Sequence, residues 1–270
     1  MKVTTLTIDG KNDTSIELPI VFDTPVRPQL IHNVFVKLNS HKFQKQGRHP
    51  TAGQDVVADS NDPPTGRGIS RVARMKGGGG GRQGQAGEVA STRGGRQAFP
   101  PNVKKVIYKK LNKKENKLAL CSAIAATASK EIVKLNGHSV DAIKEFPIIV
   151  TDEIENISKT AEMKKIIKSL NLSDDVKRLK KRKPRSGKVA LRGRKSKIGK
   201  SILFVVSNSS KIENSCSAIP GVDARSVNDL SVLDLAPGSK PIRLTVYSKK
   251  AINEINKIKS THLELMVKIK

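Results

Sequence analysis

The sequence predicts an α/β protein: an open, mainly parallel sheet with helices on both faces, which carries a long extended inserted loop. Short apolar runs alternate along the chain with segments in which apolar residues recur at helical spacing, as is typical of such a sheet. The run SILFVVS (201–207) is apolar throughout, as expected for a strand covered on both faces. Residues 46–104 are the exception, because they show no sustained apolar period and hold 13 of the 20 glycines.

The N-terminal part of the chain predicts two short strands and one helix. The segments KVTTLTI (2–8) and SIELPI (15–20) have the composition of strands, and the DGKND between them is typical of a turn. Apolar residues then recur at helical spacing over 31–38. We expect this first helix to end near Lys45 or Gly47.

A second helix is predicted to begin after Asn112, because Asn112 and Glu115 have the spacing of a capping box. Its apolar face runs over residues 118–132, and many alanines on that face suit close packing against a sheet. The Asn-Gly pair at 136–137 is typical of a helix stop.

The remaining elements alternate between strand and helix. FPIIV (146–150) and RLTVYS (243–248) predict strands, while the apolar spacing at 163–170 and 252–258 predicts helices. The acidic pair at 174–175 favours the first turn of the next helix.

Two stretches near the C-terminus are harder to interpret. Residues 224–238 predict a strand, then a helix capped by Asn228, then a stop at Gly238. The last segment, HLELMVKIK (262–270), alternates like a strand but has no evident place in the sheet.

These elements predict one globular domain from residues 1–45 plus 105–270, with residues 46–104 as an extended loop inserted after the first helix. Ordering a backbone costs roughly 1–2 kcal/mol per residue, and the loop has little apolar surface to offset that cost. We therefore expect the loop to be disordered in the free protein and ordered on a partner.

The charge of the chain indicates a polyanionic partner. Its 51 Lys and Arg against 24 Asp and Glu give a formal net charge of +27, and such an excess destabilises a compact free protein by self-repulsion. Nucleic acid is the expected partner. No signal peptide or bilayer-spanning run is present, so we expect a soluble intracellular protein with no membrane partner. Cys121 and Cys216 predict neither a disulfide framework nor a metal site.

Three segments resemble enzyme motifs, but each fails a requirement of its motif. The glycine-rich segment 77–87 contains G-x-G-x-x-G without a strand before it or a helix after it. GRKSKIGKS (193–201) has five residues between its glycines where a P-loop has four. GHSVD (137–141) lacks the closing glycine of a nucleophile elbow. We therefore predict no catalytic residue, no metal and no cofactor.

Basic clusters are the candidate functional residues. Residues 176–200 contain 13 Lys and Arg and no acid, and residues 104–117 contain seven lysines. A solvated face is the alternative for the first cluster, and a flexible linker is the alternative for the inserted loop. The predicted RNA-binding residues are Arg48, Arg67, Arg71, Arg74, Lys76, Arg82, Arg93, Arg96, Lys104, Lys105, Lys109, Lys110, Lys177, Arg178, Lys180, Lys181, Arg182, Lys183, Arg185, Lys188, Arg192, Arg194, Lys195 and Lys197.

The shortage of aromatic residues favours folded RNA over single strands. Single-strand readers stack bases on aromatic rings, but this chain has six Phe, two Tyr and no Trp. Glycine lets backbone approach a crowded surface, and arginine forks reach phosphates in two-pronged geometry. The inserted loop is therefore expected to lie between RNA helices.

Five motifs carry a resemblance to a known family. RVARMKGGGGGRQGQAG (71–87) and STRGGRQAFPP (91–101) precede the alanine-rich LALCSAIAATAS (118–129). KVALRGRKSKIGKSILFVVS (188–207) and IPGVDARSVNDLSVLDLAPGS (219–239) follow in order. In these motifs, and over nearly the whole chain, the sequence resembles the family of the fourth universal protein of the large ribosomal subunit, in its archaeal–eukaryotic type.

The resemblance implies a structural ribosomal protein of the cytoplasm, not an enzyme. It implies an α/β domain bound to large-subunit ribosomal RNA, a role in assembly, and a loop that lines the peptide exit tunnel. Neighbouring large-subunit proteins and the nascent peptide are the other implied partners. The implied tunnel-lining tip is Ser70, Arg71, Arg74, Met75, Lys76, Gly77, Gly78, Gly79, Gly80, Gly81 and Arg82.

Two alternatives stay open at this point. One is an RNA-binding accessory protein outside the ribosome, which would be lost from salt-washed large subunits. The other is a nucleotide-dependent enzyme, since α/β sheets host many activities. Nucleotide binding by the isolated protein would indicate the latter.

Overall fold

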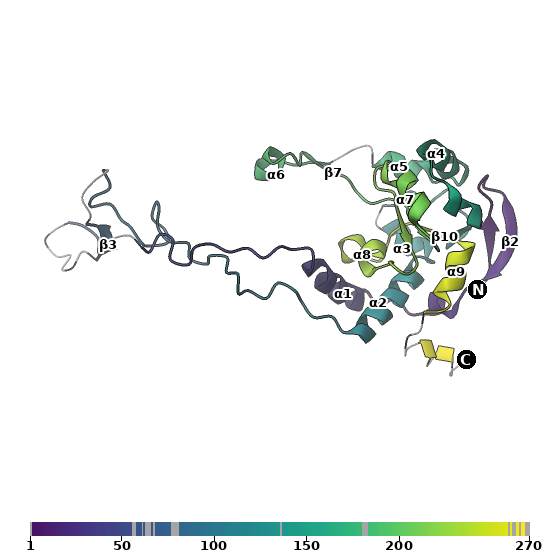
Figure 1. Cartoon of the computed structure of the whole chain (residues 1–270), viewed down its shortest axis with the longest axis horizontal. Coiled ribbons are helices and arrows are strands. Elements are labelled where there is room, and N and C mark those ends of the chain that lie inside the picture. Colours follow the sequence, from purple (N-terminus) through teal and green to yellow (C-terminus); the bar gives the residue numbers. More distant parts are fainter. Residues whose placement is uncertain are drawn as a thin grey trace. The chain divides into compact units, whose positions relative to one another are not determined.

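In a computed structural model, the chain divides into two units. Residues 1–39 with 110–270 form the globular unit, and residues 40–109 form the arm. Figure 1 shows the helices and strands of both units. The described residues are 2–55, 58–60, 62, 66, 68–76, 81–135, 137–179, 183–258, 260, 263–264 and 266–267.

Six strands form the sheet of the globular unit, in the order β2-β1-β5-β10-β8-β9. β2 runs antiparallel to β1, and the other neighbouring strands are parallel. The strands are β1 (Lys2–Leu6), β2 (Asn12–Glu17), β5 (Ile148–Val150), β8 (Leu203–Val206), β9 (Asp223–Ser226) and β10 (Thr245–Ser248). The predicted mainly parallel α/β sheet is confirmed.

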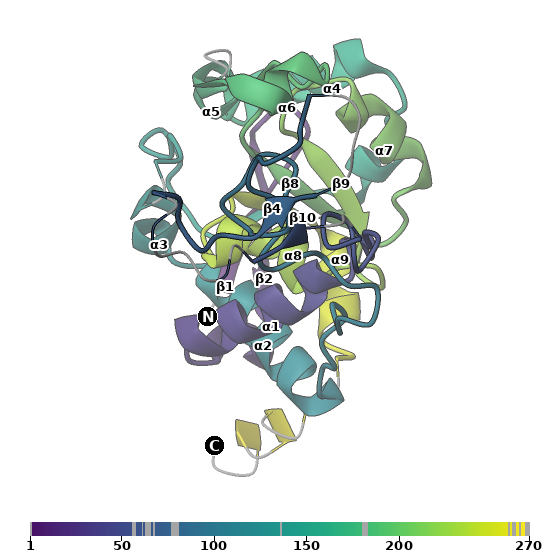
Figure 2. The same ribbon diagram turned by 90° about the vertical axis from the view of Figure 1, so that its left-hand side faces the viewer.

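Helices cover both faces of this sheet (Figure 2). The longer helices are α1 (Pro28–Ser40), α2 (Lys113–Ala126), α4 (Thr160–Ser169), α7 (Ser210–Ser217) and α9 (Lys249–Ile255). Successive strand residues point to opposite faces. Phe204 and Val246 therefore pack in one core with α4 and α7, while Leu203 and Tyr247 pack in a second core with α1, α2 and α9.

Shorter elements connect these layers. They are η1 (Ile20–Asp23), α3 (Lys130–Leu135), η2 (Asp152–Asn156), α5 (Ser173–Arg178), β6 (Lys183–Pro184), α6 (Gly187–Leu191), β7 (Ser196–Lys197), α8 (Val232–Leu235) and η3 (Pro237–Ser239). β6 and β7 pair with each other in a separate two-stranded sheet.

The helix before the arm and the helix after it begin as predicted but differ in detail. α1 ends at Ser40, earlier than Lys45 or Gly47. The Asn112 side chain accepts a hydrogen bond from the Lys114 amide at 3.0 Å, so the predicted N-cap is confirmed. No bond from Glu115 completes a capping box; its carboxylate accepts from Lys37 Nζ at 2.9 Å.

The helix expected over 118–132 is interrupted, and the chain forms α2 and α3 with a break between them. At the break, the Thr127 hydroxyl donates to the Ile124 carbonyl and contacts the Tyr247 hydroxyl at 2.9 Å. A threonine side chain that bonds backbone in this way competes with the helical ladder.

Two predictions near the C-terminus are wrong. The predicted Asn228 cap is replaced by Ser231, whose amide and hydroxyl both donate to the Asp234 carboxylate at 3.2 and 2.6 Å, so α8 begins at Val232. The segment that alternates like a strand is helical where it is described, at 263–264 and 266–267.

The arm consists of two legs joined by a small folded tip, with β3 (Ala58–Asp59) antiparallel to β4 (Arg74–Met75) (Figure 1). The Met75 amide donates to the Gln85 carbonyl at 2.9 Å, and the Gly87 amide donates to the Ala73 carbonyl at 2.9 Å. Three backbone segments therefore lie side by side at the tip.

Glycine allows the two legs of the arm to approach closely. Gly53 has φ +87°, and a Cβ added there would lie 2.6 Å from the Gly95 carbonyl carbon and 2.7 Å from the Arg96 nitrogen. Any other residue at position 53 would push the legs apart. Further toward the globular unit in sequence, Arg48 Nη1 donates to Gln97 Oε1 at 2.7 Å.

Tyr247 provides a test of the second core, because it is fully buried and its hydroxyl contacts Thr127. Tyr247→Phe should lower the free energy of unfolding by about 1 kcal/mol, since one buried hydrogen bond is lost without a cavity. Urea denaturation measures the change. The matched control is Tyr108→Phe in the arm, where the side chain is 47% exposed. Equal stability of Tyr247→Phe and the unchanged protein would contradict this role.

Candidate nucleic-acid interface

The segment expected to be a basic run is folded into a hairpin, which we call the basic hairpin (residues 183–197). Lys183 pairs with Lys197 and Pro184 with Ser196, and the Arg185 amide donates to the Lys195 carbonyl at 2.9 Å. α6 lies between the two strands. The segment thus has a defined backbone.

The basic hairpin presents cationic side chains to solvent. Arg185 is half-buried and the other cations of the hairpin are exposed. Within the described part of the chain, none of these cations forms an ion pair with a carboxylate. The set is Lys183, Arg185, Lys188, Arg192, Arg194, Lys195 and Lys197.

Cations of the arm fall into two groups. Arg48 and Lys76 are engaged within the arm, by Gln97 and by the Asp59 carboxylate respectively. Arg74 donates to the Gly84 carbonyl at 2.9 Å and is half-buried. The second group, exposed and without such a partner in the described ranges, includes Arg71, Arg82, Arg93, Arg96, Lys104, Lys105 and Lys109, and Lys110 is exposed at the start of the following segment of the globular unit.

The predicted tunnel-lining tip is described only in part. Ser70 and Gly81 are exposed, and Met75 is half-buried. The Met75 side chain packs against Gly87, because a Cβ added to Gly87 would lie 2.9 Å from Met75 Cγ. Several predicted residues lie outside the described residues: Arg67, Gly77, Gly78, Gly79, Gly80, Lys180, Lys181 and Arg182.

Three cations beside the basic hairpin are already paired inside the protein. Lys177 pairs with Asp174 at 2.9 Å, and Arg178 Nε donates to the Asp175 carboxylate at 3.0 Å. Lys200 pairs with Asp223 at 2.7 Å. Of the cluster 176–200, the hairpin cations alone are unpaired in the described ranges.

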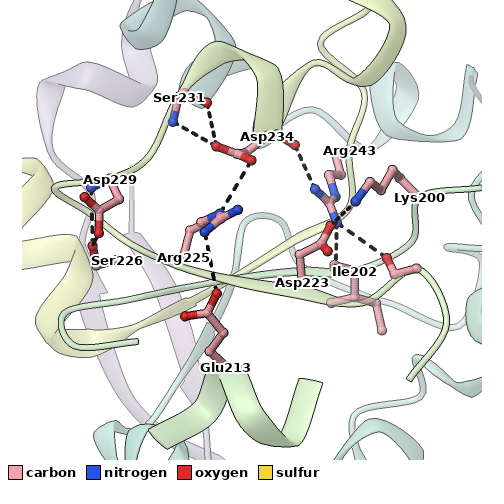
Figure 3. Close-up of polar contacts among 11 residues, drawn as sticks. Lys200, Ile202, Glu213, Asp223, Arg225, Ser226, Asp229, Ser231, Asp234 and Arg243 are labelled. Atoms are coloured by element: carbon pink, nitrogen blue, oxygen red, sulfur yellow. Dashed lines mark hydrogen bonds and ion pairs between the residues drawn. The ribbon is translucent and has the colours of Figure 1, made fainter. Parts of the chain in front are cut away.

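Buried charged groups near the start of β8 and β9 are functional candidates that sequence reasoning missed (Figure 3). Arg243 is 1% exposed and donates to the Ser201 carbonyl at 3.1 Å and to the Asp234 carbonyl at 3.0 Å. Its guanidinium also pairs with the Asp223 carboxylate. The available signal was a single arginine at the head of the apolar segment 243–248.

A second buried group lies at the N-terminal end of α5. Asp175 is fully buried, and its carboxylate accepts from the Ser139 amide at 3.1 Å and from the Ser201 hydroxyl. His138 Nδ1 lies 3.0 Å from the same carboxylate. The acidic pair Asp174 and Asp175 therefore lies in the first turn of α5, as predicted. Asp175, however, is buried and bonds to groups in the protein interior.

Burial and hydrogen bonding compete at these carboxylates. Burial alone would raise the pKa of Asp175, but hydrogen bonds and charge from His138, with Ser201 and Arg178, outweigh it and hold the pKa at about 2. At Asp223, burial is likewise outweighed by Lys200 and Arg243, so its pKa is lowered. Burial lowers the pKa of Arg243 against the attraction of Asp223. Both carboxylates are ionised at neutral pH.

The described residues offer little for covalent or metal chemistry. Cys121 and Cys216 are buried free thiols, and burial raises their pKa values to about 11 and about 12. No group of three His, Cys, Asp or Glu residues in the described ranges could hold a metal ion. Among the helices that can be described, none has the length and apolarity needed to cross a membrane.

The geometry defines an α/β protein with a cluster of unpaired cations on the basic hairpin and exposed arginines and lysines along the arm. The family model described as "Ribosomal protein L4/L1 family" matches residues 16–258, so the chain belongs to that family and is a structural ribosomal protein, not an enzyme. A "Large ribosomal subunit protein uL4" of Sulfolobus acidocaldarius is 44% identical over 254 residues, covering 93% of this chain and 92% of the relative. Proteins of the same name from Methanosphaera stadtmanae (39% identical) and Methanococcus aeolicus (41%) cover 94% and 95% of this chain and 96% and 99% of the relatives.

The depressed pKa of Asp175 predicts acid sensitivity of the globular unit. The unfolded chain binds this proton near pH 3.8 and the folded chain near pH 2, so the carboxylate stabilises the fold above about pH 4. This contribution, about 2 kcal/mol, is lost as the pH falls from about 4 to 2. Asp175→Asn should lower stability at pH 7 and flatten its decline between pH 4 and 2 in urea denaturation. The control is the exposed Asp9→Asn, and parallel pH profiles for Asp175→Asn and the unchanged protein would contradict the assignment.

Proposed function

We propose that this chain is a component of the large ribosomal subunit in the cytoplasm, where it binds large-subunit ribosomal RNA and supports subunit assembly. The globular unit binds RNA through the basic hairpin. The arm enters the RNA, and its tip lines the peptide exit tunnel beside the nascent peptide. Neighbouring large-subunit proteins complete its surroundings.

The observation that carries this proposal is the set of unpaired cations on the basic hairpin. An exposed lysine or arginine without an acidic partner is free to neutralise a phosphate and release its counterions. Six such cations, together with the half-buried Arg185, form a dense positive surface on a short, defined backbone, with no acid among residues 176–200 to offset it. Family membership supports ribosomal RNA as the polyanion.

The arm supports RNA contact for a different reason. Arg71, Arg82, Arg93 and Arg96 are exposed along it, and a guanidinium reaches phosphate oxygens in two-pronged geometry. Its glycines allow two legs to run close together, which keeps the arm narrow enough for a gap between RNA helices. The tip, Ser70–Arg82, would then face the tunnel.

Neutralising the basic hairpin tests the proposal. Replacing Lys188, Arg192, Arg194 and Lys195 with Ala should weaken binding to deproteinised large-subunit ribosomal RNA. Because about three or four phosphate contacts are removed, the slope of log Kd against log salt should become shallower by about 3. Filter binding or fluorescence anisotropy, measured at salt concentrations from about 50 to about 400 mM, gives the slope.

The matched control removes the same charge elsewhere on the globular unit. Lys159, Lys164, Lys165 and Lys168 lie in or beside α4 and are exposed, and their replacement with Ala should change the slope by less than about 1. Equal slope changes in the two variants would mean that net charge alone matters, and would refute a specific interface on the basic hairpin.

A further inference from the structure

The two chain segments that enter and leave the basic hairpin are held together by a small cluster of residues, of which Asp175, Leu179 and Arg243 are buried. We call it the hairpin base. It comprises Asp175, Arg178, Leu179, Gly199, Gly221 and Arg243.

One part of the hairpin base is polar and links residues on either side of the hairpin directly. Arg178 Nε donates to the Asp175 carboxylate at 3.0 Å, and Arg178 Nη2 donates to the Lys200 carbonyl at 3.2 Å. The Ser201 hydroxyl donates to the same carboxylate. One arginine fork and one carboxylate therefore hold residues 178 and 200–201 together.

A second part is apolar and depends on two glycines. Leu179 is 7% exposed, and a Cβ added to Gly199 would lie 2.7 Å from its Cδ2. A Cβ on Gly221 would collide with Leu179 Cδ1 and lie 2.8 Å from the Gly199 carbonyl oxygen, and Gly221 has φ +79°. Leu179 thus occupies the space that side chains at 199 and 221 would fill. This explains the glycine that gave GRKSKIGKS its likeness to a phosphate loop.

The third part is Arg243, which fixes the segment leaving the hairpin. Besides Ser201, its guanidinium donates to the Ile202 and Gly221 carbonyls at 3.4 Å each. Figure 3 shows Lys200 and Arg243 directed to the same Asp223 carboxylate. The strand that follows the hairpin therefore begins at a position set by a buried arginine.

Stability alone does not account for two buried charged residues, Asp175 and Arg243, at one place in the fold. Well-packed apolar residues often replace a buried ion pair without loss of stability, whereas charged groups with several directed hydrogen bonds restrict the geometry. We infer that the hairpin base aims the basic hairpin, with Asp175, Arg178 and Arg243 as positioning residues for RNA binding. This inference rests on the proposed function. It also changes the role expected for Arg178, from phosphate contact to alignment.

The physical consequence is a loss of affinity without a loss of phosphate contacts. A hairpin that pivots must be ordered when it binds, and that cost weakens binding. The number of cations that meet phosphate stays the same, so the salt slope stays the same. A phosphate contact would behave in the opposite way, because its removal reduces the slope.

Arg178→Lys tests the inference, because lysine keeps the charge but cannot donate to Asp175 and Lys200 in a fork. Binding of the full chain to deproteinised large-subunit ribosomal RNA should weaken about tenfold with an unchanged salt slope. Leu179→Ala is the second variant, because it removes the apolar contact and no charge, and the same result is expected. The matched control is Arg27→Lys, at an exposed arginine on a distant segment of the sequence, which should bind like the unchanged protein.

A distance measurement separates this inference from the proposed function. Spin labels at Lys188→Cys and Lys211→Cys, both exposed, report the distance from the basic hairpin to α7 in the free protein, since Cys121 and Cys216 are buried. The distance distribution should be narrow in the unchanged protein and broad in Arg178→Lys and Leu179→Ala. A narrow distribution in both variants, or RNA binding as tight as that of the unchanged protein, overturns the inference. Absence of salt-dependent RNA binding by the unchanged protein would instead refute the proposed function.

Discussion

The chain carries 51 Lys and Arg against 24 Asp and Glu. The constraint on which the fold depends is that this surplus of positive charge must stay outside the apolar core. Ile, Val, Leu and Ala fill both faces of the sheet. The cations that do enter the interior are matched there, as Arg243 is by Asp223. Many of the cations without an acidic partner in the described ranges lie on the basic hairpin and the arm, where a polyanion can replace the missing acids. Fold and proposed function thus follow from the same separation of charge.

Glycine serves two purposes in this arrangement, and both involve close contact between backbones. In the arm, Gly53 lets two legs lie against each other. In the hairpin base, Gly199 and Gly221 leave room for Leu179. Neither set of glycines forms a catalytic loop. A chain short of aromatic residues is expected to recognise RNA by shape and phosphate, and narrow segments that carry arginine suit that mode of recognition.

The sequence was informative where a period or a local cap determines structure. The apolar run before Ser207 predicted β8, and Asn112 predicted the start of α2. The sequence was uninformative where contacts between residues far apart in the chain determine the local structure. The break at Thr127 depends on Tyr247, 120 positions away, and the hairpin base joins Arg178 to a carbonyl 22 positions away. In the sequence, Arg243 is a single charged residue at the end of a predicted strand. Its pairing with Asp223 exists only in the folded chain. Charge density identified the candidate interface but not its geometry.

We expect the cationic arm to be enclosed by ribosomal RNA in the assembled subunit. Photoreactive residues at positions 71, 82, 93 and 96, one at a time, in purified large subunits test it most directly. Cross-links are expected from 93 and 96 to large-subunit ribosomal RNA, and from 71 and 82 also to a nascent chain in stalled ribosomes. Assembled, active subunits in which none of the four positions cross-links to RNA would contradict it.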